Sequence, residues 1–200
     1  MNDPLAFWDW FLANEERFQL LKDQQAPELL DELEMRLAQA HPELCLVIES
    51  GLDGVCEFII TAEGNPELFD EVREFVSAAP SVEGWRVVAF KPPRGFEFEV
   101  DVPTGSLAVC ELWFVPLQSE THPDLLGVRF GIPGYDEGLR DDYLFACYQI
   151  LDRGLGELAA FEEIDHIEVA GLPKDPQAEG FVPLGQLPDV IVWRKARTEI

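Results

Sequence analysis

The chain has 200 residues, 47% of them hydrophobic, so it can bury a sizeable core as one large domain or two small ones. Its 39 acidic residues outnumber 14 basic ones, and the formal net charge of −25 argues against binding to nucleic acid or to an anionic membrane. The acidic residues are spread along the chain and form no acidic tail. Such charge indicates either solvated helix faces that keep the protein in solution or an anionic surface for a basic partner.

The beginning of the chain lacks a basic flank and an uninterrupted apolar stretch, because Asp3, Asp9, Glu15 and Glu16 interrupt it. We therefore expect neither a signal peptide nor a membrane anchor, and a cytoplasmic location.

The first helix is expected over residues 4–22. A second begins at Pro27, since proline suits the first helical position, and ends at His41-Pro42. Its leucines recur at every fourth position and form a core-facing stripe.

Two apolar runs, 44–48 and 55–61, predict a hairpin around a glycine-containing turn. Asn65-Pro66 then reads as the N-cap and first residue of a helix that ends at 79–80, and a strand is expected over 85–90.

The second half of the chain repeats this order. Residues 96–100 alternate apolar and acidic positions, as in a half-exposed edge strand. Later segments predict a strand pair, a helix ended by Gly154 and a closing strand. Their expected ranges are 107–117 and 125–132 for the pair, 139–151 for the helix and 164–170 for the last strand.

These elements predict an α+β fold, with an antiparallel sheet built from two ββαβ-like units, helices on one face and an N-terminal helical pair. We expect one domain over residues 1–200. Its parts are an N-terminal helical layer (1–42), the first unit (44–90), the second unit (107–170) and a wrapping C-terminal segment (171–200). In that last segment Arg194, Lys195 and Arg197 form a basic cluster. It either pairs with the acidic residues of the rest of the protein or lies in a frayed chain end.

No pattern in the sequence supports catalysis or a bound cofactor. The three histidines lie far apart and form no metal-binding motif, and hydrolase, nucleotide-binding and dinucleotide-binding motifs are absent. The four cysteines make no C-x-x-C pair and lie in apolar runs, so they read as reduced and structural. We predict no catalytic residue, no cofactor and no metal.

The first helix carries polar residues among its aromatic ones. On a helical wheel Asn14 falls within the apolar face, and Glu15 falls between Phe11 and Trp8. A carboxylate or amide removed from water without a partner costs several kcal/mol, so both side chains must be hydrogen-bonded or open onto a cleft. Internal hydrogen bonding is the stronger expectation, and a pocket beside Trp8 is the alternative.

Two further segments are candidate sites. Glu63 and Asn65 lie in the turn before a predicted helix, and helix N-termini bind anions, although capping alone explains both residues. Glu157 follows a glycine-rich turn, where Gly154 ends a helix and Gly156 permits close packing. It is the polar residue there that local structure leaves unexplained.

Several of these segments together resemble a family of uncharacterised bacterial proteins of about this length. The resemblance rests on the FWxWFxxNE segment at 7–15, the ITAEGN segment at 60–65, Ala79-Pro80, Gly84-Trp85 and the LGE segment at 155–157. It implies a shared fold and a bacterial, cytosolic setting, and it implies no catalytic role.

The leading functional hypothesis is a non-enzymatic protein whose anionic surface binds a basic partner, as an inhibitor or immunity factor does. The alternative is a small-molecule-binding domain or enzyme with a carboxylate-lined pocket. That pocket would be formed by Asn14, Glu15, Glu63 and Glu157. A third interpretation is a homodimer formed through the edge strand at 96–100.

Overall fold

The computed structural model of the chain describes residues 3–18, 21, 26–51, 53–118, 122 and 124–198. The chain forms two compact units, unit 1 (Met1–Lys91) and unit 2 (Pro92–Ile200). The single domain expected over 1–200 stays a prediction, and the border between the units falls directly after its first ββαβ segment. In the described part of the chain, no helix is both long and apolar enough to cross a membrane.

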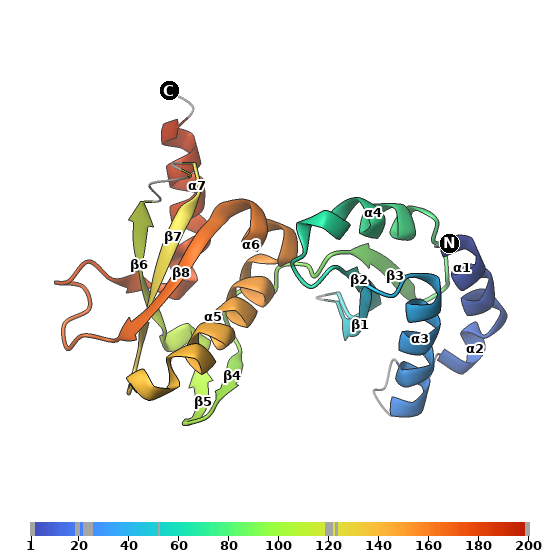
Figure 1. Ribbon diagram of the computed structural model, residues 1–200, viewed down its shortest axis with the longest axis horizontal. Coiled ribbons are helices and arrows are strands. Elements are labelled where there is room, and N and C mark those ends of the chain that lie inside the picture. Colours follow the sequence, from blue (N-terminus) through green and yellow to red (C-terminus); the bar gives the residue numbers. More distant parts are fainter. Residues whose placement is uncertain are drawn as a thin grey trace. The chain divides into compact units, whose positions relative to one another are not determined.

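Unit 1 consists of an N-terminal group of helices followed by a ββαβ segment (Figure 1). The strands β1 and β2 pair antiparallel, and β3 pairs parallel with β2. The parallel pair follows from the helical crossover between β2 and β3, since a strand that returns through a helix enters the sheet in the same direction. The elements are α1 (Pro4–Ala13), α2 (Glu15–Phe18), α3 (Pro27–Ala40), β1 (Cys45–Ser50), β2 (Cys56–Thr61), η2 (Pro66–Leu68), α4 (Phe69–Ser77) and β3 (Trp85–Ala89).

The first helix is shorter than the expected range of 4–22. It ends at Ala13, where Asn14 becomes the C-cap and the side-chain Nδ2 of Asn14 donates to the Trp10 carbonyl at 2.8 Å. The short helix α2 then begins at Glu15. An asparagine side chain that bonds the preceding turn competes with the helical backbone, which explains the break. Residues 19, 20 and 22 of the expected helix lie outside the described residues.

Aromatic side chains form the core of unit 1. Phe7, Trp8 and Phe11 on α1 contact Phe58 on β2, with ring centroids 5.3 to 6.2 Å apart. The Nε1–H of Trp8 donates to the carbonyl of Phe75 at 2.9 Å. Phe75 lies in the last turn of α4, where carbonyls have no partner inside the helix. This hydrogen bond therefore ties α1 to the end of α4.

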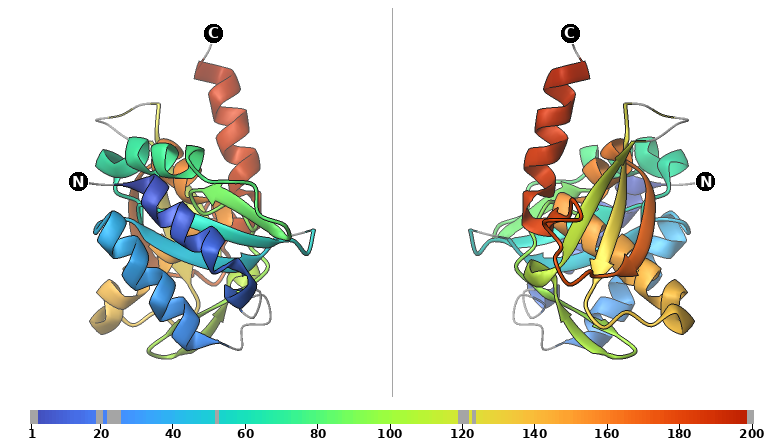
Figure 2. Two further views of the ribbon diagram at one scale, coloured as in Figure 1. Left: turned by 90° about the vertical axis from the view of Figure 1, so that its right-hand side faces the viewer. Right: turned by 90° about the vertical axis from the view of Figure 1, so that its left-hand side faces the viewer.

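Unit 2 contains a four-stranded sheet in the order β8-β7-β6-β9 and a separate hairpin of β4 and β5 (Figure 2). Again the first strand pair, β6 and β7, is antiparallel, and the pair closed by the helical crossover, β7 and β8, is parallel. The elements are β4 (Glu99–Val102), β5 (Gly105–Ala108), η3 (Val109–Glu111), β6 (Trp113–Gln118), β7 (Leu126–Ile132), η4 (Glu137–Leu139), α5 (Arg140–Leu155), α6 (Glu157–Glu163), β8 (Ile164–Gly171), β9 (Val182–Pro183), η5 (Leu184–Gln186) and α7 (Leu187–Thr198).

The α+β class, the N-terminal helical pair and the two ββαβ segments are confirmed. The two segments share a local device as well as a topology. Asn65 accepts from the backbone N–H of Glu67 at 3.1 Å before α4, and Asp136 accepts from that of Gly138 at 2.9 Å before α5. The strands belong to three separate sheets rather than one antiparallel sheet, and each ββαβ segment closes its own sheet with a parallel strand.

Two strand predictions in unit 2 differ from the structure. The segment 96–100 enters a strand only at Glu99, and the expected strand 107–117 is divided by the 3₁₀ turn η3. The first part, β5, pairs with β4 instead of joining the main sheet. The apolar run from Leu107 to Leu117 is interrupted only at Glu111 and Pro116, so the pattern alone does not reveal the break.

The two glycines at the end of α5 have the opposite roles to those expected. The helix continues through Gly154 and ends at Gly156, whose φ of 86° is a left-handed conformation that favours glycine. Gly154 instead permits close packing. A Cβ there would lie 2.2 Å from Cε1 of Phe96.

The C-terminal segment contains a helix that was not predicted. After β9 it forms α7, which carries the basic cluster. The Nζ of Lys195 forms an ion pair with Glu163 at the end of α6. This pairing agrees with the interpretation that the cluster binds acidic residues of the rest of the protein.

Candidate functional site

The polar residues predicted within the aromatic helix have structural roles. Trp8 is a core residue with 2% of its surface exposed. Asn14 is half-buried, and besides capping α1 its Oδ1 accepts from Arg17 at 3.1 Å. Glu15 is the half-buried first residue of α2, where a carboxylate is favourable against the helix dipole. Internal hydrogen bonding accounts for Asn14, as the sequence favoured.

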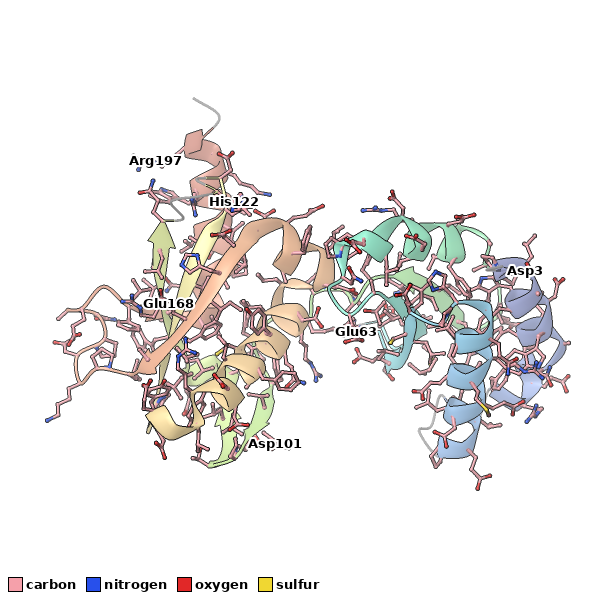
Figure 3. All side chains as sticks on the ribbon, viewed as in Figure 1. Asp3, Glu63, Asp101, His122, Glu168 and Arg197 are labelled. Carbon is pink, nitrogen blue, oxygen red and sulfur yellow. The ribbon has the colours of Figure 1, made fainter. Side chains whose placement is uncertain are left out.

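The turn that contains Glu63 and Asn65 is strained and held by an ion pair. Figure 3 labels Glu63. Glu63 has φ of 51°, and Phe90, directly after β3, has φ of 66°. They are the non-glycine residues with positive φ among those described. The Nζ of Lys91 contacts Oε2 of Glu63 at 2.9 Å, and the N–H of Phe90 donates to the carbonyl of Ile60 at 2.8 Å. Strained backbone at the carboxyl ends of adjacent parallel strands is typical of binding sites.

Glu157 belongs to a different unit from the other candidate residues. It is the first residue of α6 in unit 2, and only 1% of its surface is exposed. Trp8, Asn14, Glu15, Glu63 and Asn65 all belong to unit 1. The pocket that would join Glu157 to them stays a prediction.

Unit 2 contains a polar cluster that the sequence did not reveal. The carboxylate of Asp165 contacts Nδ1 of His122 at 2.7 Å and Nδ1 of His166 at 3.1 Å. The register between β7 and β8 shifts at this point, because Leu126 pairs with Ile164 and Gly127 with His166. Asp165 is therefore the extra residue of a β-bulge, a device that redirects a side chain and recurs near functional sites.

The ring of His166 lies across the neighbouring strand. A Cβ at Gly127 would lie 2.2 Å from Cε1 of His166, so only glycine leaves room for the imidazole in this position. A carboxylate that accepts from Nδ1 fixes the ring orientation and leaves Nε2 for proton transfer or ligand binding. Within the described ranges, no group of three or more His, Cys, Asp and Glu is placed to hold a metal ion.

Three surface cavities lined by described residues include one that is clearly larger than the other two. Two in unit 1 measure about 160 and 150 Å³, and one in unit 2, between α7 and the strands β6 and β7, measures about 460 Å³. The smallest is lined by His41, which is 4% exposed and whose Nδ1 has no hydrogen-bond partner among the described residues, together with Glu71 and Glu74. Ligand sites usually span about 300 to 1,000 Å³, so only the largest is of ordinary ligand size.

Helix α5 exposes aromatic residues on the side opposite its core contacts. Phe145 is 64% exposed and Tyr148 is 55% exposed. Asp141 and Asp152 continue the same stripe, since positions 141, 145, 148 and 152 follow the i, i+4, i+7, i+11 spacing of one helix face. We call these four residues the α5 stripe. Tyr143, Cys147 and Ile150 lie on the opposite, buried side.

Comparison of the chain with protein-family models, with curated proteins and with solved structures finds no match. The resemblance described above therefore stays an expectation.

Sequence reasoning missed the His122–Asp165–His166 cluster because it joins residues 43 positions apart. It also missed the α5 stripe, although a signal was present. The predicted helix 139–151 has Phe145 and Tyr148 on the side opposite Tyr143, Cys147 and Ile150, which a helical wheel separates.

Proposed function

We propose that this protein is a non-enzymatic binding protein of the bacterial cytoplasm that engages a basic protein partner, as inhibitor or immunity-type factors do. The observation that carries the proposal is the α5 stripe, in which two exposed aromatic side chains lie between two aspartates. The partner would present an apolar surface flanked by lysine or arginine.

Exposed aromatic residues support an interface because they are costly to leave in water. Large exposed apolar patches mark interaction sites, and aromatic side chains dominate the binding energy of interfaces. Phe145 and Tyr148 each have few rotatable bonds, so they bury a large area at a low entropic cost.

The negative net charge of the chain supports a positively charged partner. The net charge of −25 favours encounter with a cation and disfavours an acidic protein. Near the aromatic residues, the side chain of Asp141 is 98% exposed, and its contact with Arg140 spans 3.5 Å. An exposed pair of this kind contributes little, so a partner's cation can replace it.

The test is a pull-down from a bacterial lysate across a salt series. We expect the wild-type protein to retain a basic protein at low ionic strength and to release it toward 1 M salt, where the screening length falls to about 3 Å. The variant F145A/Y148A and the variant D141N/D152N, which neutralises the two aspartates of the α5 stripe, should each lose the retained protein.

Two matched variants serve as controls. M35A truncates an apolar side chain on α3 that is 62% exposed, and E28Q/D31N removes two exposed charges from that same helix. Both should retain the partner as the wild type does. Equal loss in the α5 and α3 variants would show that overall charge or folding, and not the α5 stripe, is responsible, and the proposal would be wrong.

A further inference from the structure

The largest of the three cavities lies in unit 2, where the strands β6 and β7 meet α7. Its volume of about 460 Å³ falls within the range of small-molecule sites. Leu117 on β6 and Leu126 on β7 form the apolar part of its wall, and Trp193 on α7 adds an aromatic ring. Leu126 is 4% exposed, so the wall rests on the packed core of the unit.

The charge of this cavity is opposite to that of the protein. Among the described residues, Arg194 and Arg197 line it together with one carboxylate, Asp124, so these residues carry a net charge of +1. The whole chain has only 14 basic residues and a net charge of −25. At physiological salt the screening length is about 8 Å, so carboxylates farther away than this affect a bound ligand less than the guanidinium groups in the wall do.

The ring of Trp193 and the guanidinium of Arg197 contact each other. The Cζ of Arg197 lies 4.7 Å from the ring centroid of Trp193, which is 60% exposed. The contact holds the guanidinium of one lining residue against the flat ring of another. Figure 3 marks Arg197 on α7.

We propose that this cavity binds a small organic anion with a planar apolar body, of the aromatic carboxylate class. A guanidinium matches a carboxylate in two parallel hydrogen bonds, and the face of the Trp193 indole that Arg197 does not cover offers a surface on which an aromatic ring can stack. Leucine side chains in the wall exclude water from the other face of the ring. The proposal does not depend on the α5 stripe or on a protein partner.

The test is calorimetric titration of the full chain with 2-naphthoate and with 2-naphthamide, which has the same shape and no charge. The wild type should bind naphthoate at least on the order of tenfold more tightly than naphthamide, the ratio that about 1.4 kcal/mol produces. In R194Q/R197Q the affinity for naphthoate should fall by a similar factor, while that for naphthamide stays within about twofold.

The control is R129Q/R140Q, which removes the same charge from two other arginines of unit 2, whose side chains are 43% and 47% exposed, and should bind naphthoate as the wild type does. D124N removes the opposing carboxylate and should bind naphthoate more tightly, a gain that misfolding does not produce. Absence of binding to the wild type, equal affinity for the two probes, or equal loss in both double variants would overturn the proposal.

Discussion

The ring of Phe96 lies against the Cα of Gly154, where any larger residue would displace it. The chain before Phe96 runs along the end of α5, where the N–H of Arg94 donates to the Arg153 carbonyl at 2.9 Å and that of Gly95 to the Gly154 carbonyl at 3.2 Å. These carbonyls belong to the last turn of the helix, which has no internal partners for them. Close approach of the two segments therefore depends on a glycine.

Replacing Gly154 by alanine should destabilise the protein, although alanine ordinarily stabilises a helix relative to glycine. Alanine inside a helix is favoured over glycine by about 1 kcal/mol, but overpacking a core costs about 1 to 3 kcal/mol. We expect G154A to lower the free energy of unfolding, measured by urea denaturation. In the F96A background the ring is absent, and the same substitution should become neutral or stabilising. A stabilising G154A in the wild-type background would contradict the contact.

Replacing Gly127 by alanine should disturb the cluster of His122, Asp165 and His166. The new Cβ would overlap the imidazole of His166, and we expect a loss of about 1 to 3 kcal/mol in the free energy of unfolding. Gly185 is the control, because a Cβ there meets no atom within 4 Å. G185A should leave the stability nearly unchanged. Equal effects of the two substitutions would mean that the ring of His166 has room to move.

Replacing Trp8 by phenylalanine should cost more than the same change at Trp10. The Phe75 carbonyl would lose the indole N–H that satisfies it, and a buried unsatisfied acceptor costs about 1 to 3 kcal/mol. Trp10 is only half-buried, so W10F should have the smaller effect on thermal unfolding. A W8F variant as stable as the wild type would show that the hydrogen bond contributes nothing.

The thiol of Cys147 should make stability fall at alkaline pH. Burial raises the pKa of Cys147 well above its ordinary value. In the unfolded chain this thiol ionises near pH 8.5, while in the folded protein it stays protonated. The unfolded state is then favoured by about 1.4 kcal/mol per pH unit above 8.5.

The measurement is the free energy of unfolding of the wild type and of C147A between pH 7 and 10. The stability difference between them should shrink as the pH rises above 8.5, since the variant lacks the group. A difference that stays constant with pH would contradict a raised pKa for this thiol.

The sequence predicted the elements of this fold better than their connections. The start of α3 at Pro27 was correct, and Asn65 caps the 3₁₀ turn η2 that leads into α4, because proline and asparagine act through local backbone chemistry. The roles of Gly154 and Gly156 were reversed, because a helix stop and a close contact both select glycine and only the position of Phe96 distinguishes them. Parallel pairing likewise depends on the crossover and not on the strand pattern.

Prediction of candidate sites succeeded only where the chemistry is local. The capping role of Asn65 lies within a few residues and was read correctly. The contact of Asp165 with His122 and the ion pair of Lys91 with Glu63 join distant positions, and no spacing rule in one sequence reveals them.

The most direct test of the proposed function places a photo-crosslinking phenylalanine analogue at position 148 of the α5 stripe. The same analogue at position 35 on α3, which is equally exposed, is the control. After irradiation in a bacterial lysate at low salt, we expect a distinct adduct with a protein of net positive charge at position 148 and none at position 35. No adduct at 148, or the same adducts at both positions, would contradict the account.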